Sequence, residues 1–452
     1  MSPPRGEPTA TTRLVQISAL LLLSGLLFLA NEVVPGNDGV GLVAGVGALL
    51  LGGTLLAELA GLVRQPHLTG YLLAGMLAGP YVARLLSVET VERMNSVNTL
   101  ALALIALAGG AELKYADVRR SFKSLTLATL LQFGLVQAAL TASFLAATPF
   151  LPFAADLSAS AQLGVALLWG VVATTRSPSA TLAILSQTRA KGPLTTYSLA
   201  FIMLSDVVVV VVFAATFAVA KPLIEPGSVL SLETMRALGH EILGSVALGT
   251  TLGLLLALYL RLLKRPLLLV LVALGFGFSE AVTYLRLEPL LTFIVAGFVV
   301  QNLTKQGDRL IHEIEKLGAL VYVLFFAVAG ANLDLDLLRR LWPVALLMAF
   351  TRGAFTFIAG QASSRWARDP AVVRRWGWTG LISQAGLTLG VAATIERTFP
   401  SFGSGFRALV IATVAVNQLI GPVLFKLGLD RAGETRPPAP ETPPLVEEEH
   451  PA

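Results

Sequence analysis

The chain has 452 residues, of which 55% are hydrophobic and only 13% are charged, and its formal net charge is +5. Because a soluble domain carries roughly 25% charged residues, this composition excludes an ordinary soluble protein and indicates an all-α polytopic membrane protein. The sequence has no cysteine and four scattered histidines, so it predicts no disulfide, no thiol catalysis, no metal site and no cofactor.

Apolar windows of about 20 residues recur along the chain, each long enough to cross a hydrocarbon core about 30 Å thick. Polar breaks between them divide the chain into fourteen predicted membrane-spanning helices. The first has no small-residue cleavage signature, so we expect a retained helix rather than a signal peptide. The predicted spans are 14–31, 40–63, 68–84, 97–113, 123–147, 161–187, 195–220, 240–263, 267–283, 289–303, 316–332, 341–362, 376–396 and 404–427.

The distribution of basic residues predicts the orientation. With the N-terminus in the cytoplasm, about two thirds of the 33 Lys and Arg residues fall in cytoplasmic segments, including the loops Lys114–Lys123 and Arg365–Arg375. This asymmetry explains the positive charge without a nucleic-acid partner. We therefore expect a cytoplasmic N-terminus over 1–13, a transmembrane domain over 14–427, and a Pro- and Glu-rich cytoplasmic tail over 428–452 that is disordered.

The span 161–187 is interrupted at its midpoint, where the sequence reads WGVVATTRSPSATLAIL. Pro178 removes a backbone donor and clashes with the preceding turn, which breaks the helix. Hydroxyl side chains can satisfy the freed backbone groups, and here they belong to Thr174, Thr175, Ser177 and Ser179. Broken helices at membrane depth lie inside the protein or beside a water-filled cavity and often form ion sites. A simple proline kink is the alternative.

A second interruption is predicted in WGWTGLISQAGLTLGVAATI, within 376–396. Its midpoint is flexible and polar, with Ser383, Gln384 and Gly386 at its centre. Glycine is common in membrane helices, so this pattern alone is weak. Paired interruptions in two halves of a chain, however, point to a transporter site.

Four ionisable residues lie deep in predicted spans: Arg176, Asp206, Glu280 and Arg352. A charge at the bilayer centre costs about 2.5–3.5 kcal/mol on insertion scales, so such residues usually face a cavity and carry function. Asp206, in FIMLSDVVVVVVFAA, is predicted to bind a proton or cation, the alternative being a packing ion pair. The same alternative applies to Arg352, and Glu280 is predicted to be interfacial.

Several stretches resemble the monovalent cation:proton antiporter superfamily, in particular its Kef-type and bacterial sodium/proton branch. The stretches are TGYLLAGMLAGP (Thr69–Pro80), LALIALAGGAELKYADVRR (Leu102–Arg120), EPLLTFIVAGFVVQN (Glu288–Asn302) and LGALVYVLFFAVAGANLDLDLL (Leu317–Leu338). Their order and spacing extend the resemblance from Val40 to Leu427.

The resemblance implies two inverted six-helix repeats, here 68–263 and 267–427, after two additional N-terminal helices. It also implies a core domain in which the unwound helices 161–187 and 376–396 cross, and a separate dimerisation domain. The implied activity is elevator-type exchange of Na⁺ or K⁺ for H⁺. The resemblance further implies a homodimer in a bacterial inner membrane, with both termini cytoplasmic.

The resemblance also assigns roles to residues. Asp206 matches the family's essential carboxylate, and Arg352 matches a basic residue that pairs with acidic groups. The sequence departs from the family pattern at two points. At the first, Ser205 replaces the Asp, Asn or Gln common before that carboxylate, and a single carboxylate favours electroneutral exchange. The Thr-Asp-Pro motif of many relatives reads Arg176-Ser177-Pro178 here, so that a carboxylate is lost and a cation gained.

These departures leave three hypotheses. With Asp206 at −1 and two arginines at +2, the presumed site has a net charge of +1, and one unit charge at 4 Å contributes about 4 kcal/mol at an effective dielectric of about 20. The leading hypothesis is cation/proton antiport, with Thr174, Thr175, Ser177, Ser205 and Asp206 as ion ligands and Arg176 or Arg352 pairing with Asp206. The others are an anion or organic-solute transporter, and a sensor locked by an Arg176–Asp206 ion pair. No nucleophile–base pattern suggests an enzyme.

Overall fold

The computed structural model describes residues 38–62, 65–225, 232–262, 289–304, 306–333, 335–384 and 386–435, with Ser18 and a few residues between 277 and 287. These residues form helices and connecting turns, with no strand among them. The predicted span 14–31, most of 267–283 with Glu280, and the tail from 436 lie outside the described residues.

The helices match most of the predicted spans, although Val88–Glu112, Leu232–Leu262 and Gly307–Ala331 begin eight or nine residues earlier than predicted. They are α2 (Asp38–Leu62), α3 (His67–Ala78), α4 (Val88–Glu112), α5 (Tyr115–Arg120), α6 (Phe122–Leu131), the π-helix η1 (Gln132–Val136), α7 (Gln137–Ala147), η2 (Thr148–Phe150), α8 (Pro152–Ala155), α9 (Ala159–Ala173), α10 (Pro178–Thr188), α11 (Pro193–Ile224), α12 (Leu232–Leu262), α14 (Pro289–Leu303), α15 (Gly307–Ala331), α16 (Leu335–Ala367), α17 (Ala371–Trp376), η3 (Gly377–Leu381), α18 (Gly386–Thr398) and α19 (Gly403–Ala432).

Five stretches of the described chain are helical, long and apolar enough to cross a membrane: Gly45–Leu62, Phe122–Phe150, Leu243–Leu262, Leu338–Ala367 and Gly403–Ala432. Shorter apolar helices include parts of α3, α4, α11, α14 and α15. Both predicted interruptions are present, because α9 and α10 are separated by residues 174–177 and η3 and α18 by residues 382–385. The prediction of an all-α polytopic fold with discontinuous helices is therefore confirmed.

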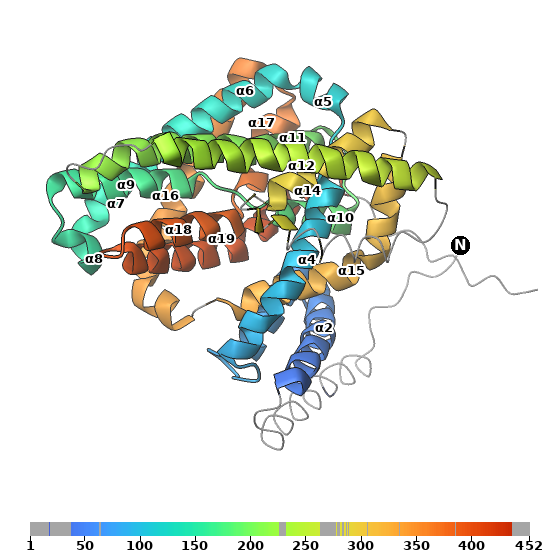
Figure 1. The fold of residues 1–452 in the computed structure, drawn as a ribbon, viewed down its shortest axis with the longest axis horizontal. Helices are drawn as coiled ribbons and strands as arrows, with labels where there is room; N and C mark the ends of the chain where they lie inside the picture. The colour runs from blue at the N-terminus through green and yellow to red at the C-terminus, as the bar shows by residue number, and fades with distance from the viewer. Residues whose placement is uncertain are drawn as a thin grey trace, which may run out of the picture.

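One group of helices packs in pairs: α3 packs against α15, and α4 packs against α14 (Figure 1). Glycines make the close approach possible: a Cβ on Gly110 of α4 would overlap the carbonyl of Ile294, and one on Gly297 of α14 would overlap that of Leu107. Gly75 and Gly330 face each other's helices in the same way across α3 and α15. Small residues at helix contacts are the usual means of packing helices in membranes.

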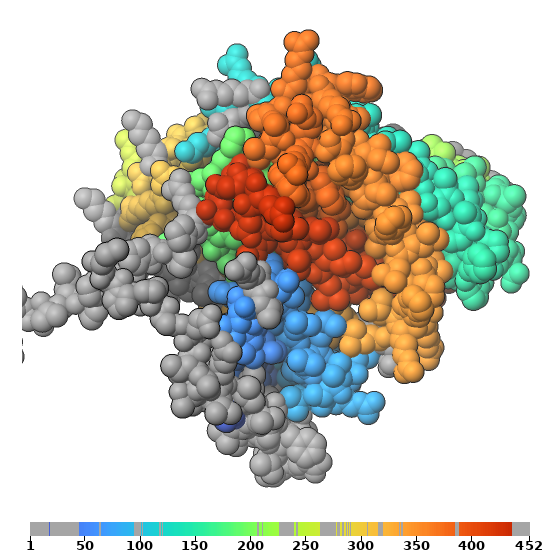
Figure 2. Space-filling model, turned by 180° about the vertical axis from the view of Figure 1, so that it is seen from behind, coloured from blue at the N-terminus to red at the C-terminus, as the bar shows by residue number. Residues whose placement is uncertain are grey.

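The second group holds the two discontinuous helices. α9 packs on α7 and α11, while α18 packs on α19, which in turn packs on α16. From behind, α19 in red lies between α16 in orange and the blue helices α2 to α4 (Figure 2). The two interruptions are therefore enclosed by α7, α11, α16 and α19. The predicted repeat limits, 68–263 and 267–427, stay a prediction.

Candidate functional site: the crossing of two broken helices

The two interrupted segments lie directly against each other. The backbone N–H of Ser177 donates to the carbonyl of Ser383, 3.0 Å away. Ser177 is also the N-cap of α10, and its Oγ accepts from the backbone N–H of Ala180 at 3.2 Å. Pro178 is the first residue of α10, a position where its missing N–H costs nothing. The proline that ends one half-helix thus begins the next.

The threonines before the break turn their hydroxyls back onto α9. Thr174 Oγ1 donates to the carbonyl of Val171 at 2.7 Å, and Thr175 Oγ1 donates to that of Val172 at 2.6 Å. The last carbonyls of a helix have no partner within the helix. The carbonyls of Val171 and Val172 also accept from the backbone N–H groups of Thr174 and Thr175, so each hydroxyl adds a second hydrogen bond at the last turn of α9.

Arg352, on α16, binds the C-terminal ends of both broken helices. Its Nε donates to the carbonyl of Ala173 at 2.7 Å, and its Nη2 donates to that of Thr175 at 2.9 Å. On the other segment, Nη1 donates to the carbonyl of Ile382 at 2.6 Å and Nη2 to that of Leu381 at 3.0 Å. A guanidinium has five N–H donors, and four of them are used here. The side chain is 1% exposed, so it holds the crossing together from within.

Arg176 is the second buried cation, at 2% exposure. Its Nη1 donates to the carbonyl of Thr174 at 2.6 Å, and its Nη2 donates to Gln132 Oε1 at 3.0 Å. The guanidinium also lies 5.0 Å from the ring centroid of Phe201 on α11 and 5.6 Å from that of Phe133, within cation–π range. Arg176 therefore contacts the helix that carries Asp206.

Gln132 begins the π-helical turn η1, a feature often found at functional sites. Its side chain is fully buried, and its Nε2 donates to the carbonyl of Thr356 on α16 at 3.0 Å. The same amide accepts from Arg176 through Oε1. Gln132 thus links the cation of the first break to α16, the helix of Arg352.

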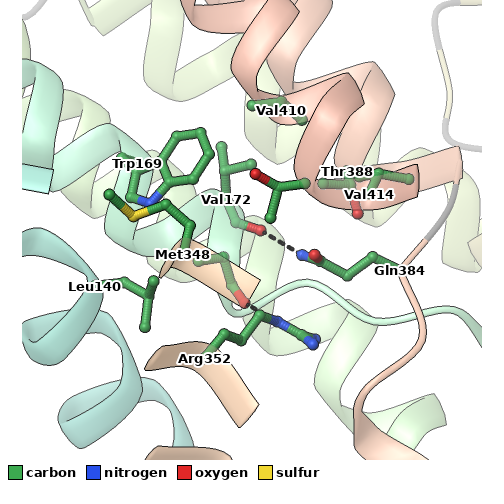
Figure 3. A pocket seen from close by; sticks show the side chains of 11 residues that line it. Leu140, Trp169, Val172, Met348, Arg352, Gln384, Thr388, Val410 and Val414 are labelled. Atoms are coloured by element: carbon green, nitrogen blue, oxygen red, sulfur yellow. Dashed lines mark hydrogen bonds between the residues drawn. The ribbon is translucent and has the colours of Figure 1, made fainter. Parts of the chain in front are cut away.

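A further amide network ties the second break to α9 and α19. Gln384 Nε2 donates to Thr175 Oγ1 at 3.1 Å. It also donates to the carbonyl of Val172 at 3.3 Å (Figure 3). Its Oε1 accepts from Asn417 Nδ2 at 2.7 Å. Thr388 Oγ1 lies 2.6 Å from Thr175 Oγ1. The polar side chains of the crossing are therefore fixed by one another.

A small cavity of about 10 Å³ lies beside the crossing, on the side of α9 and α18. Its apolar wall includes Trp169 and Met348, and Arg352, Gln384 and Thr388 form part of its polar wall (Figure 3). The described residues of both interruptions are buried, so the crossing lies inside the protein, one of the two settings in which a broken helix at membrane depth is tolerated.

The comparisons with known proteins agree with this geometry. The transmembrane family of sodium/hydrogen exchangers matches residues 46–428, most of the chain. The chain belongs to the sodium/hydrogen exchanger family. None of the curated proteins matches it.

Solved structures show the same fold. A structure of the sodium/proton antiporter MjNhaP1 from Methanocaldococcus jannaschii has a TM-score of 0.63 at 15% identity, covering 88% of this chain and 100% of that chain. An electron-microscopy structure of the same antiporter has a TM-score of 0.67 at 15% identity, covering 88% and 99%. The family match, together with the apolar helices, makes this chain a multi-pass membrane transporter rather than an enzyme. It also confirms the resemblance seen in the sequence.

The remaining predicted residues of the exchanger are Ser205 and Asp206 on α11 and Gly386 at the start of α18. Ser205 is buried on α11, and its Oγ donates to the carbonyl of Ile202 at 2.8 Å. Asp206 follows it within α11, and Gly386 is the first residue of α18. The side chain of Asp206 lies outside what the structure describes, so its role as an ion ligand stays a prediction.

Sequence reasoning missed Gln132, Asn417 and Thr388. Each is uncharged, and the search for deep polar groups considered ionisable side chains. The signal was available for the two amides, because Gln132 and Asn417 lie in largely apolar stretches, TLLQFGL and TVAVNQLI. A buried amide needs partners just as a charge does, and these partners lie on the broken helices.

Proposed function

We propose that this exchanger moves one monovalent cation, Na⁺ or K⁺, against one proton, with Asp206 as the group that carries them alternately. The observation that best supports a cation is the environment of Arg352. Its four hydrogen bonds go to carbonyls at the ends of two half-helices. The positive charge of Arg352 is therefore directed at the backbone carbonyls of the crossing.

The charge balance of the site follows from this. The C-terminus of a helix is equivalent to roughly −0.5 elementary charge, so two such ends offset the +1 of Arg352. Asp206 and Arg176 then remain as one negative and one positive group. The net charge of +1 counted from the sequence falls to about zero, and a site of that charge no longer repels a monovalent cation.

Arg176 is the proposed partner of Asp206 when no cation is bound. It contacts Phe201, which lies about one and a half helical turns before Asp206 on α11. An incoming cation or proton would replace the guanidinium at the carboxylate. Thr174, Thr175, Ser177 and Ser205 are the proposed oxygen ligands for a cation beside Asp206.

One carboxylate in the site favours electroneutral exchange. Ser205 and Ser177 stand at the positions where a second acid would add a charge. Alternating access in such folds is largely a rigid-body movement of one bundle against another, and we propose an elevator-type shift of the helices around the crossing. A homodimer in a bacterial inner membrane with cytoplasmic termini completes the proposal.

Ion flux in reconstituted vesicles tests this function. An outward or inward gradient of Na⁺ or K⁺ is expected to drive proton movement reported by a pH-sensitive dye, over pH 6–9. Because exchange is one for one, clamping the membrane potential at zero with valinomycin and equal K⁺ should leave the Na⁺-driven rate unchanged. A complete absence of cation-driven proton movement would falsify the proposal, and a rate that follows the potential would contradict the stoichiometry.

Replacing Arg176 with glutamine is expected to lower the Na⁺ concentration for half-maximal exchange about tenfold. The variant removes the guanidinium charge that competes with Na⁺ for Asp206. A tenfold change corresponds to about 1.4 kcal/mol, a fraction of the roughly 4 kcal/mol available between close charges. Initial rates of proton movement against Na⁺ concentration measure it, with the exposed Arg340→Gln as the matched control. A half-maximal concentration that rises or stays constant would contradict the proposed pairing. Loss of anion-driven uptake instead would favour an anion carrier.

A further inference from the structure

The last described residues of the chain contain a buried carboxylate. Helix α19 ends at Ala432, and Gly433 closes it with a left-handed backbone, φ 72°. Glu434 follows and is only 5% exposed. Of the charged side chains whose burial the structure describes, only Arg176, Arg352 and Glu434 are buried. Burying a carboxylate is costly unless hydrogen bonds compensate, so its partners define its role.

Those partners are the first turn of α11. The Oε1 of Glu434 accepts from the backbone N–H of Leu194 at 2.7 Å. Its Oε2 accepts from the backbone N–H and the hydroxyl of Thr195, both at 2.8 Å. The first N–H groups of a helix have no partner within it and carry a partial positive charge, so a carboxylate satisfies them well.

The backbone on both sides is shaped for this contact. The N–H of Lys191 donates to the carbonyl of Glu434 at 3.0 Å. Gly192, the N-cap of α11, lies so close that a Cβ there would overlap the side chain of Glu434. The segment before α11 therefore leaves room for this carboxylate and for little else.

The two helices joined in this way both serve the crossing. α11 carries Asp206, whereas α19 carries Asn417, which holds Gln384 of the second break. Glu434 lies beyond residues 46–428, the part of the chain that the exchanger family matches. The contact thus connects the two halves of the site through a residue that follows α19.

We propose that Glu434 is a positioning residue for exchange. Its carboxylate fixes the start of α11 to the end of α19, so that the helix of Asp206 and the second broken helix move as one body. This inference rests on the proposed role of Asp206. Because the ion site lies far along α11 from its first turn, the contact governs the rate of movement and leaves cation binding unchanged.

Two variants break the contact from opposite sides: Glu434→Ala removes the carboxylate, and Gly192→Ala inserts a methyl group into its place. In the full-length protein, each is expected to speed hydrogen–deuterium exchange of the Leu194 and Thr195 amides at least tenfold. In vesicles, each should lower the maximal exchange rate per folded protein at least threefold, with the half-maximal Na⁺ concentration changed less than twofold.

The double variant, with Gly192→Ala and Glu434→Ala together, distinguishes a positioning role of Glu434 from general destabilisation of the fold. Gly192→Ala should have no further effect once Glu434 is alanine, because the methyl group then meets no side chain. Glu448→Ala, which removes a carboxylate elsewhere in the tail, is the control and should match the unmodified protein. Additive losses in the double variant, unchanged amide exchange, or an unchanged maximal rate would each overturn the proposal. If the Asp206→Asn variant still transports ions, the proposed function is wrong. Hydrogen–deuterium exchange of the Leu194 and Thr195 amides would in that case still test the contact of Glu434.

Discussion

Replacing Asp206 with asparagine is expected to reduce sodium/proton exchange at least 100-fold, to the level of empty vesicles. Asparagine keeps the size of the side chain but cannot be ionised, so it can neither bind a cation by charge nor release a proton in its place. A loss of 100-fold corresponds to about 2.7 kcal/mol, which is less than a single close charge interaction supplies at low dielectric. Na⁺-driven proton movement measures the effect.

The matched control for Asp206→Asn is Asp308→Asn, which neutralises an exposed carboxylate in the first turn of α15. It should exchange at the unmodified rate. If the Asp206 variant retains more than a tenth of the normal rate while its amount in the vesicles is unchanged, another group carries the ion.

The helices were predictable because hydrophobic length and helix breakers act locally. α14 spans Pro289–Leu303, as predicted, and the first break falls at Pro178, where the missing N–H fixes the boundary. The second break has no proline, so glycine and polar residues could place it only approximately. α15 begins earlier than predicted, at Gly307, because its first turns carry charges that hydropathy excludes from a span.

The partners of the site residues could not be predicted in the same way. The sequence places Arg352 at membrane depth and suggests a carboxylate as its partner. Its observed partners are backbone carbonyls. Because every residue has a backbone carbonyl, no pattern of side chains in the sequence could identify these partners. Only the crossing of two segments distant in sequence brings Ala173 and Ile382 to one guanidinium.

Replacing Arg352 with methionine is expected to destabilise the fold and abolish exchange together. The variant keeps an unbranched side chain but leaves four carbonyls, those of Ala173, Thr175, Leu381 and Ile382, without this donor. Each buried unsatisfied group costs about 1–3 kcal/mol. The free energy of unfolding should fall by about 5 kcal/mol, lowering the melting temperature by about 10 °C. Thermal unfolding in detergent, monitored by size-exclusion chromatography, measures the change in melting temperature.

Arg352→Lys separates charge from geometry. A lysine restores the positive charge and three donors but lacks the planar fork that reaches both half-helix ends. Its melting temperature should therefore lie between those of Arg352→Met and the unmodified protein, with exchange still reduced at least tenfold. Arg365→Met, on the exposed last turn of the same helix, should leave both measurements unchanged. If Arg352→Lys instead restores full exchange and stability, the charge alone matters, and the hydrogen bonds to the broken helices do not hold the crossing together.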